Sequence, residues 1–362
     1  MIEVRPDCRL VFCVGVGGVG KTTFAASLAL QQALLGRSVL VLTADPAKRL
    51  ADALGIQSLT DQASRVPLDG VGGAPSTGSL HAAMLETKAS ADAIIRRASE
   101  DPARAERVLD NKIYQAFSNT LARSHAYAAM ERIHEALKLP KYDLVVVDTP
   151  PAQSAIEILD APARLVRFLD QRVVRWFLQP ADETPRLRGG AITRRLLTTI
   201  AGESLVTALT GFLSEMAFLR EGFAVRATEV RDVMRSSDTE FVLVAAADAM
   251  GIAASRSVAD EVASRGFTLG YVVLNRAFIP EADGLSFTSG DYPPSLRPFG
   301  ETLDRMAEWA VEEQASRVAA VAAIRKERSE PVWALPESSR PLGDPSALEA
   351  WIQGARNADE MT

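Results

Sequence analysis

Short, continuous apolar runs recur along the chain and alternate with stretches that have helical spacing. The first run covers Leu10 to Val14; after a glycine-rich stretch, a helical segment extends from Lys21 to about Leu35, where Gly36 supplies a stop. The later runs are Val39 to Thr43, Leu144 to Val147, Phe241 to Ala245 and Tyr271 to Leu274. Runs of this kind are typical of parallel strands buried on both faces. The pattern predicts the α/β class, with a mostly parallel sheet and helices on both faces.

Two long stretches have helical periodicity and no strand signal. They extend from about His81 to Leu139 and from about Ala155 to Arg235. In the second stretch, apolar residues recur at spacings of three and four along one stripe, from Leu205 to Phe223. We therefore expect residues 1–80, 140–154 and 236–362 to form the α/β core, and residues 81–139 and 155–235 to form an inserted helical subdomain.

Composition and charge narrow the class of protein. The 362 residues are 47% apolar and 24% charged, which is ordinary for a soluble globular protein. The net charge of −6 disfavours a general nucleic-acid binder, because contacts to phosphates require a basic face. No clean apolar run reaches the roughly 18 residues of a membrane span, and Met1 to Val14 lacks the pattern of a signal peptide. We expect a cytoplasmic protein with no nucleic-acid partner and no stable membrane insertion.

The glycine-rich stretch from Gly15 to Thr22 fits the phosphate-loop pattern G-x-x-x-x-G-K-[ST] without a mismatch. A predicted strand precedes it and a predicted helix follows it, as this P-loop motif requires. Backbone N–H groups and the helix N-terminus would bind phosphates, Lys21 would reach the β- and γ-phosphates, and the Thr22 hydroxyl would bind Mg²⁺. The nucleotide-binding residues expected from the loop and the helix start are Gly17, Gly18, Val19, Gly20, Lys21, Thr22 and Thr23.

Three polar residues follow predicted strands, at the sheet edge where ligands bind in such folds. Asp45 precedes a proline, so it could begin a turn, or its carboxylate could orient water for attack on the γ-phosphate. Asp148 ends an apolar run and could hold Mg²⁺, often through water, or cap a loop. Asn275 could contact the edge of adenine or form a turn, and its position alone favours the turn.

Together these elements resemble the arsenite-transport and tail-anchored-protein-targeting branch of the P-loop ATPases. Four ordered motifs carry the resemblance: Gly17 to Thr23, Ala44 to Ala47, Asp148 to Pro151, and Val273 to Arg276. The resemblance implies that Asp45 and Lys21 are catalytic, that Thr22 and Asp148 hold Mg²⁺, and that Asn275 contacts adenine. It further implies a dimer that binds ATP and Mg²⁺, whose cycle opens and closes the helical subdomain for a client such as an apolar protein segment.

One departure from that family affects catalysis. Val16 stands where the family's loop normally carries a second lysine, which supplies positive charge across the dimer. Lys48 and Arg49 are the nearest replacements in sequence, unless they are ordinary solvated surface charges. Two hypotheses follow: a working ATPase, or a weakly hydrolysing scaffold. In the second case this chain could be the partner, in a heterodimer, of a relative that keeps the lysine.

Overall fold

The computed structural model describes residues 2–45, 49–72, 77–85, 101–111, 114–115, 125–150, 224–279 and 295–361, with residues 92, 95, 96, 99, 160, 211 and 293. The chain divides into two compact units. One comprises Met1–Met84, Pro140–Ala155 and Arg235–Thr362, and the other comprises Leu85–Leu139 and Ile156–Met234. No helix among the described residues combines the length and the apolar character that crossing a membrane demands.

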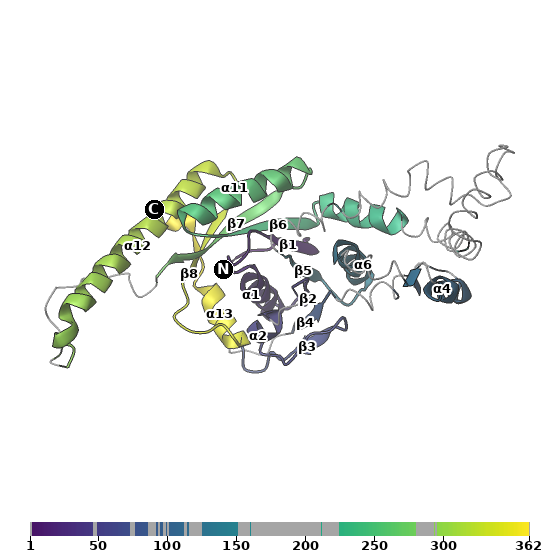
Figure 1. The fold of residues 1–362 in the computed structure, drawn as a ribbon, viewed down its shortest axis with the longest axis horizontal. Helices are drawn as coiled ribbons and strands as arrows, with labels where there is room; N and C mark the ends of the chain where they lie inside the picture. The colour runs from purple at the N-terminus through teal and green to yellow at the C-terminus, as the bar shows by residue number, and fades with distance from the viewer. Residues whose placement is uncertain are drawn as a thin grey trace, which may run out of the picture. The chain divides into compact units, whose positions relative to one another are not determined.

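The first unit is built on a nine-stranded sheet in the order β3-β4-β2-β5-β1-β6-β7-β8-β9 (Figure 1). Neighbouring strands run parallel except at the two edges, where β3 and β9 pair antiparallel to their neighbours. The strands are β1 (Leu10–Val14), β2 (Ser38–Thr43), β3 (Ser64–Val66), β4 (Ser79–Met84), β5 (Leu144–Asp148), β6 (Thr239–Ala246), β7 (Leu269–Phe278), β8 (Val332–Pro336) and β9 (Arg356–Asn357).

Helices cover both faces of this sheet, which confirms the predicted α/β class (Figure 1). The helical segments of the first unit are α1 (Lys21–Leu34), α2 (Arg49–Ala53), α11 (Ala249–Ser264), η2 (Arg297–Phe299), α12 (Gly300–Glu327), α13 (Pro345–Gln353) and η3 (Ala358–Glu360). Helices α1 and α13 pack together on one face, and α11 and α12 contact β6 and β7 on the other. The central strands β1 and β5 are buried along their whole length.

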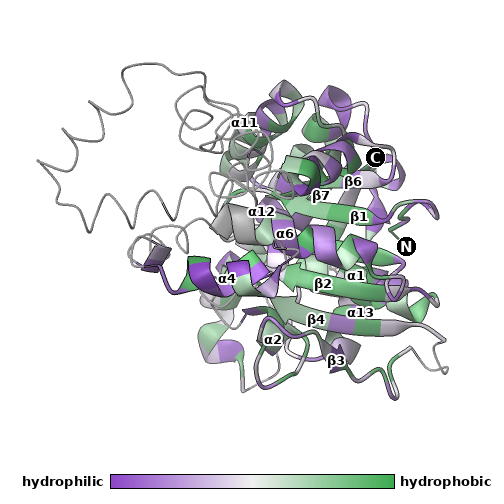
Figure 2. Cartoon of the chain, turned by 90° about the vertical axis from the view of Figure 1, so that its right-hand side faces the viewer, coloured by the Kyte–Doolittle hydropathy of each residue, from purple (hydrophilic) through white to green (hydrophobic). Residues whose placement is uncertain are grey.

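Hydrophobic burial explains why the central strands form. Every residue of β1 is buried, and Figure 2 shows the hydrophobic character of β1 and β2. On the α1 side, Phe24 and Leu28 are fully buried against the sheet. On the other side, the rings of Phe12 and Phe241 stack with their centroids 5.1 Å apart. A strand with apolar neighbours on both faces needs a continuous apolar run.

The prediction of no strand between His81 and Leu139 is wrong for its first residues, because β4 continues to Met84. Its sequence, Ser-Leu-His-Ala-Ala-Met, contains few residues with high strand propensity. Pairing with β2 on one side and β3 on the other stabilises it instead. In the second unit the structure describes α4 (Pro102–Leu109) and α6 (His125–Lys138). Every apolar residue of the predicted stripe from Leu205 to Phe223 lies outside the described residues.

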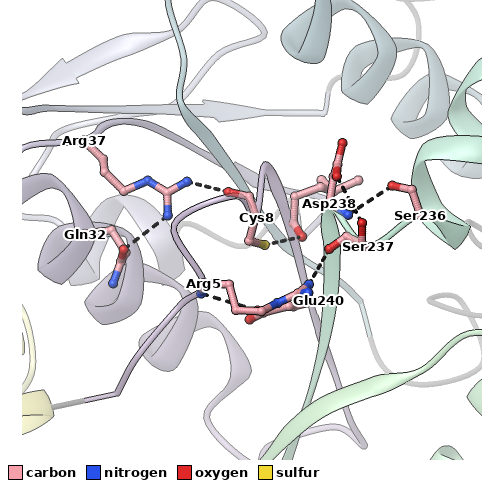
Figure 3. A network of polar contacts seen from close by, with 9 residues as sticks. Arg5, Cys8, Gln32, Arg37, Ser236, Ser237, Asp238 and Glu240 are labelled. Atoms are coloured by element: carbon pink, nitrogen blue, oxygen red, sulfur yellow. Dashed lines mark hydrogen bonds and ion pairs between the residues drawn. The ribbon is translucent and has the colours of Figure 1, made fainter.

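A polar network lies at the end of the sheet where the central strands begin (Figure 3). Arg5 reaches Glu240 at the start of β6, with Nε 2.6 Å from Oε1, and its guanidinium also donates to Ser237 O. Arg37, in the turn before β2, donates to Cys8 O. The Cys8 thiol donates to Leu10 O, and burial raises its pKa to about 12. Contacts within the chain therefore hold the amino-terminal ends of the strands together. The candidate site lies at the other end of the sheet, where the strands finish.

Candidate functional site

The chain leaves β1 at the carboxyl edge of the sheet and forms the predicted loop. Gly15 is buried so close to β6 that an added Cβ would overlap Val244 O. Gly17 and Gly18 are exposed, whereas Val19 is buried in the core. Gly20 has a φ of 93°, a left-handed conformation that glycine adopts without strain. The loop thus packs tightly at both ends and presents its middle to solvent, as a phosphate-binding loop requires.

Helix α1 begins at Lys21, directly after the loop. Thr22 and Thr23 lie half-buried in its first turn, which contains no acidic residue. The first N–H groups of a helix have no partner within the helix and favour an anion. The positions of Lys21, Thr22 and Thr23 therefore suit contact with phosphate.

The Lys21 side chain is buried over the loop, and its Nζ donates to Val16 O at 2.8 Å. Burial lowers the pKa of Lys21, and the nearby carboxylates of Asp148 and Asp45 oppose that effect. Electrostatic attraction to these acids favours the ammonium form. The structure therefore places a cation beside the loop, with two acids close enough to affect its charge.

Asp148 ends β5 and is almost fully buried, at 1% exposure. Thr43 Oγ1 donates to its Oδ2 at 2.8 Å, while Oδ1 has no hydrogen-bond partner. Burial raises the pKa of Asp148 to about 6, although the nearby hydroxyls of Thr43 and Thr22 and the charge of Lys21 lower it. An unpaired buried carboxylate oxygen beside a threonine hydroxyl fits Mg²⁺, which prefers oxygen ligands. Thr22 and Asp148, predicted separately from sequence, are thus brought together.

Asp45 follows β2 and lies near both Lys21 and Asp148. Its backbone N–H donates to Thr43 Oγ1 at 3.1 Å. Arg49 Nη1 lies 3.4 Å from Asp45 Oδ2, and the charge of Arg49 also acts on Lys21. Arg49 is therefore close to the site, whereas Lys48, the other predicted replacement for the missing lysine, lies outside the described residues.

Two threonines that are not among the predicted site residues also contribute to the site. The Thr43 hydroxyl donates to Asp148 and accepts from the backbone of Asp45, so it connects the two acids. The Thr149 hydroxyl donates to Cys13 O at 2.6 Å and ties the end of β5 to β1. The available sequence signal is the position: each is a hydroxyl residue where an apolar strand ends.

Asn275 lies near the carboxyl end of β7, and its side chain contacts the loop. Its Nδ2 donates to Val19 O at 2.9 Å, and its Oδ1 accepts from the backbone N–H of Arg276 at 2.8 Å. The two roles expected for Asn275 from the sequence were adenine contact and turn formation, and neither includes a bond to the loop. Val16 is partly buried and packs against the core.

Comparison with known proteins bears on this arrangement. A sequence model of the anion-transporting ATPase family (ArsA ATPase) matches residues 8–288. This chain belongs to that family. The match begins just before β1 and includes the loop, both acids and Asn275. The resemblance inferred from the four sequence motifs is confirmed at the level of the anion-transporting ATPase family.

Individual relatives agree with this membership. The chain is 26% identical over 277 residues to ATPase get3 of Aspergillus terreus, covering 75% of this chain and 74% of the relative. It is 23% identical over 274 residues to an ATPase ASNA1 homolog of Cryptosporidium parvum, covering 75% and 66%. It is 28% identical over 306 residues to an uncharacterised protein of Streptomyces coelicolor, covering 83% and 69%. These relatives support an ATPase of the anion-transporting ATPase family.

Proposed function

We propose that this chain binds ATP with Mg²⁺ and hydrolyses it, as a dimeric member of its family. The observation that carries the proposal is the convergence of Lys21, Thr22 and Asp148 beside the loop, with one buried oxygen of Asp148 unpaired. A structural carboxylate in such an apolar setting would normally have all its lone pairs satisfied. A divalent cation is the simplest partner for that oxygen.

Each residue then has a distinct task. Backbone N–H groups from Gly17 to Thr23 would hold the phosphates, and Lys21 would balance the negative charge on the β- and γ-phosphates. Thr22 and Asp148 would hold Mg²⁺, which neutralises charge on the phosphate oxygens when bound. Asp45 would accept a hydrogen bond from the attacking water and orient it toward the γ-phosphate. Its position near Lys21 and Asp148 supports this role.

The missing second lysine leaves two versions of the proposal. In the first, Arg49 supplies the positive charge, since it lies beside Asp45 and its side chain is 68% exposed and able to turn toward phosphate. In the second, Val16 leaves the site short of charge, and the chain is a weakly hydrolysing scaffold or the partner of a lysine-bearing relative. The ion pair between Arg49 and Asp45 supports the first version.

Further parts of the proposal follow from the family. ATP would bind at a dimer interface, and its hydrolysis would open and close a helical subdomain formed by residues 85–139 and 155–235, since residues 81–84 belong to β4. The client would be an apolar protein segment, and the location would be cytoplasmic. These parts rest on the resemblance and on the helices α4 and α6 in the second unit.

ATP turnover by the purified chain tests the catalytic part. Asp45→Asn should lower kcat by about a hundredfold or more, because a positioned acid or base typically contributes that much, while ATP affinity should change little. Asp260→Asn is a matched control, since it removes one negative charge from an exposed position on α11. Equal turnover by wild type and Asp45→Asn would contradict the assigned role.

The two versions are separated by a second comparison. Arg49→Ala should reduce turnover if Arg49 replaces the missing lysine. Tight ATP binding by wild type with negligible turnover would favour the scaffold or partner version instead. Rapid hydrolysis by this chain alone, retained after both Lys48 and Arg49 are changed, would contradict the heterodimer.

A further inference from the structure

Both polar atoms of the Asn275 side-chain amide form hydrogen bonds within the chain. The residue is 8% exposed; Nδ2 donates to Val19 O in the loop, and Oδ1 accepts from the N–H of Arg276. The main-chain oxygen of Asn275 accepts from the N–H of Ala247 at 3.1 Å. The residue is thus held from three directions, and the bond to Val19 joins positions 256 apart in sequence.

The loop is shaped to receive this amide. A Cβ on Gly20 would overlap Nδ2 of Asn275, and the φ of 93° at Gly20 is strained for other residues. Glycine at this position therefore does two things: it permits the turn into α1, and it leaves room for Asn275. The Asn275 side-chain amide thus fills the space between the strand β7 and the loop at Val19 and Gly20.

The backbone of β7 is distorted at the same place. Arg276 has a φ of 55°, and among the described residues it is the one non-glycine residue with a positive φ. The pairing of β7 with β8 is also irregular between Leu274 and Phe278. Such strained conformations persist where the surroundings hold them, and they cluster at functional sites. At this distorted point of the strand the N–H of Arg276 donates to Oδ1 of Asn275, and that bond orients the amide.

We propose that Asn275 is a positioning residue for the phosphate loop, holding Val19 and Gly20 in the form that binds the polyphosphate of any nucleoside triphosphate. This inference rests on the proposed function, because it assumes that the loop binds phosphate. Val19 O lies beside the buried side chain of Asn275, where loss of its donor leaves a carbonyl without a partner. The loop would then order only when ligand binds, which lowers affinity for the phosphates themselves.

The test compares ligands with and without the base. The dissociation constants of Mg·ATP, Mg·ITP and inorganic Mg·tripolyphosphate are measured calorimetrically for wild type and Asn275→Ala. All three should weaken by a similar factor, about tenfold for the loss of one buried hydrogen bond. A loss confined to ATP, with ITP and tripolyphosphate unchanged, would show that Asn275 acts on adenine and would overturn the proposal. Unchanged affinity for all three would overturn it too.

Failure of the phosphate-binding part of the proposed function gives a different result, because wild type would then bind none of the three ligands. A double-mutant cycle with Gly20→Ala separates positioning from general destabilisation. Gly20→Ala alone creates a clash with the amide, and Asn275→Ala removes that clash. The affinity lost in the double variant should therefore be smaller than the product of the two single losses. Multiplicative losses would contradict the coupling between Gly20 and Asn275. A fall in the thermal stability of Asn275→Ala that alone accounts for the affinity change would contradict the positioning role.

Discussion

Asp148→Asn should stabilise the nucleotide-free protein and, on the proposed function, weaken its binding of Mg²⁺. Asp148 is 1% exposed, and burial raises its pKa to about 6 from the ordinary value of 3.8. A buried carboxylate whose pKa is raised is less stable as an anion in the folded state than in the unfolded state. Near neutral pH the folded protein therefore carries an unfavourable charge that asparagine lacks.

The magnitude follows from the two pKa values. A tenfold change in a proton equilibrium corresponds to about 1.4 kcal/mol, so a rise from 3.8 to about 6 destabilises the folded state by about 3 kcal/mol at pH 7. Asparagine keeps an acceptor for the Thr43 hydroxyl. Its amide NH₂ replaces the unpaired Oδ1, so one unpaired buried group remains in either protein. The charge is therefore the main difference.

The pH dependence has a definite sign. Because the folded-state pKa is the higher one, folded wild type binds the proton more tightly, and its stability falls as pH rises from about 4 to about 7. The advantage of Asp148→Asn should be about 3 kcal/mol at pH 7, about half of that at pH 5, and small at pH 4. Urea unfolding followed by tryptophan fluorescence, without nucleotide, measures it at each pH.

Two results would refute this reasoning. One is an Asp148→Asn protein no more stable than wild type at pH 7; the other is a gain that does not change between pH 5 and pH 7. Asp260→Asn, which removes a charge from an exposed position on α11, should show no comparable gain. Addition of Mg·ATP should raise the Tm of wild type and have little effect on Asp148→Asn, since ligand binding stabilises only a form that binds it.

Two further substitutions test the backbone around the loop. Gly15→Ala should lower the free energy of unfolding by about 1–3 kcal/mol and weaken ATP binding, because its Cβ would overlap Val244 O. Normal ATP affinity with an unchanged Tm would contradict that geometry. Arg276→Gly should raise the free energy of unfolding by about 1 kcal/mol, because glycine adopts a φ of 55° without strain; thermal unfolding checks it, and a lower Tm would contradict it.

Sequence patterns predicted the centre of the sheet well because those strands are buried on both faces. A run such as Leu144 to Val147 has no polar residue that would permit another placement. β4 was missed because its formation depends on β2 and β3, which supply its backbone partners. Its own residues, with His81 and two alanines, carry little preference for a strand.

At the site, the motif predicts which residues lie on the loop, and strand order explains why Asp148 lies beside it. β5 pairs with both β1 and β2, so Cys13 and Thr43 both align with Asp148. The bond from Asn275 to Val19 could not be predicted in this way. It depends on an irregular strand end and on a left-handed residue that is not glycine, and neither leaves a pattern in hydrophobicity or spacing.

The Thr43 hydroxyl couples Asp45 and Asp148 electrostatically. Its oxygen atom donates a hydrogen bond to Asp148 and accepts a hydrogen bond from the backbone N–H of Asp45. Chained hydrogen bonds polarise one another, so a change of charge on Asp148 alters how strongly that oxygen holds the amide. Neutralising Asp148 would thus loosen the start of the segment that carries Asp45 and Arg49. A hydroxyl on a rigid strand can in this way transmit an electrostatic event at one strand end to the backbone of the next.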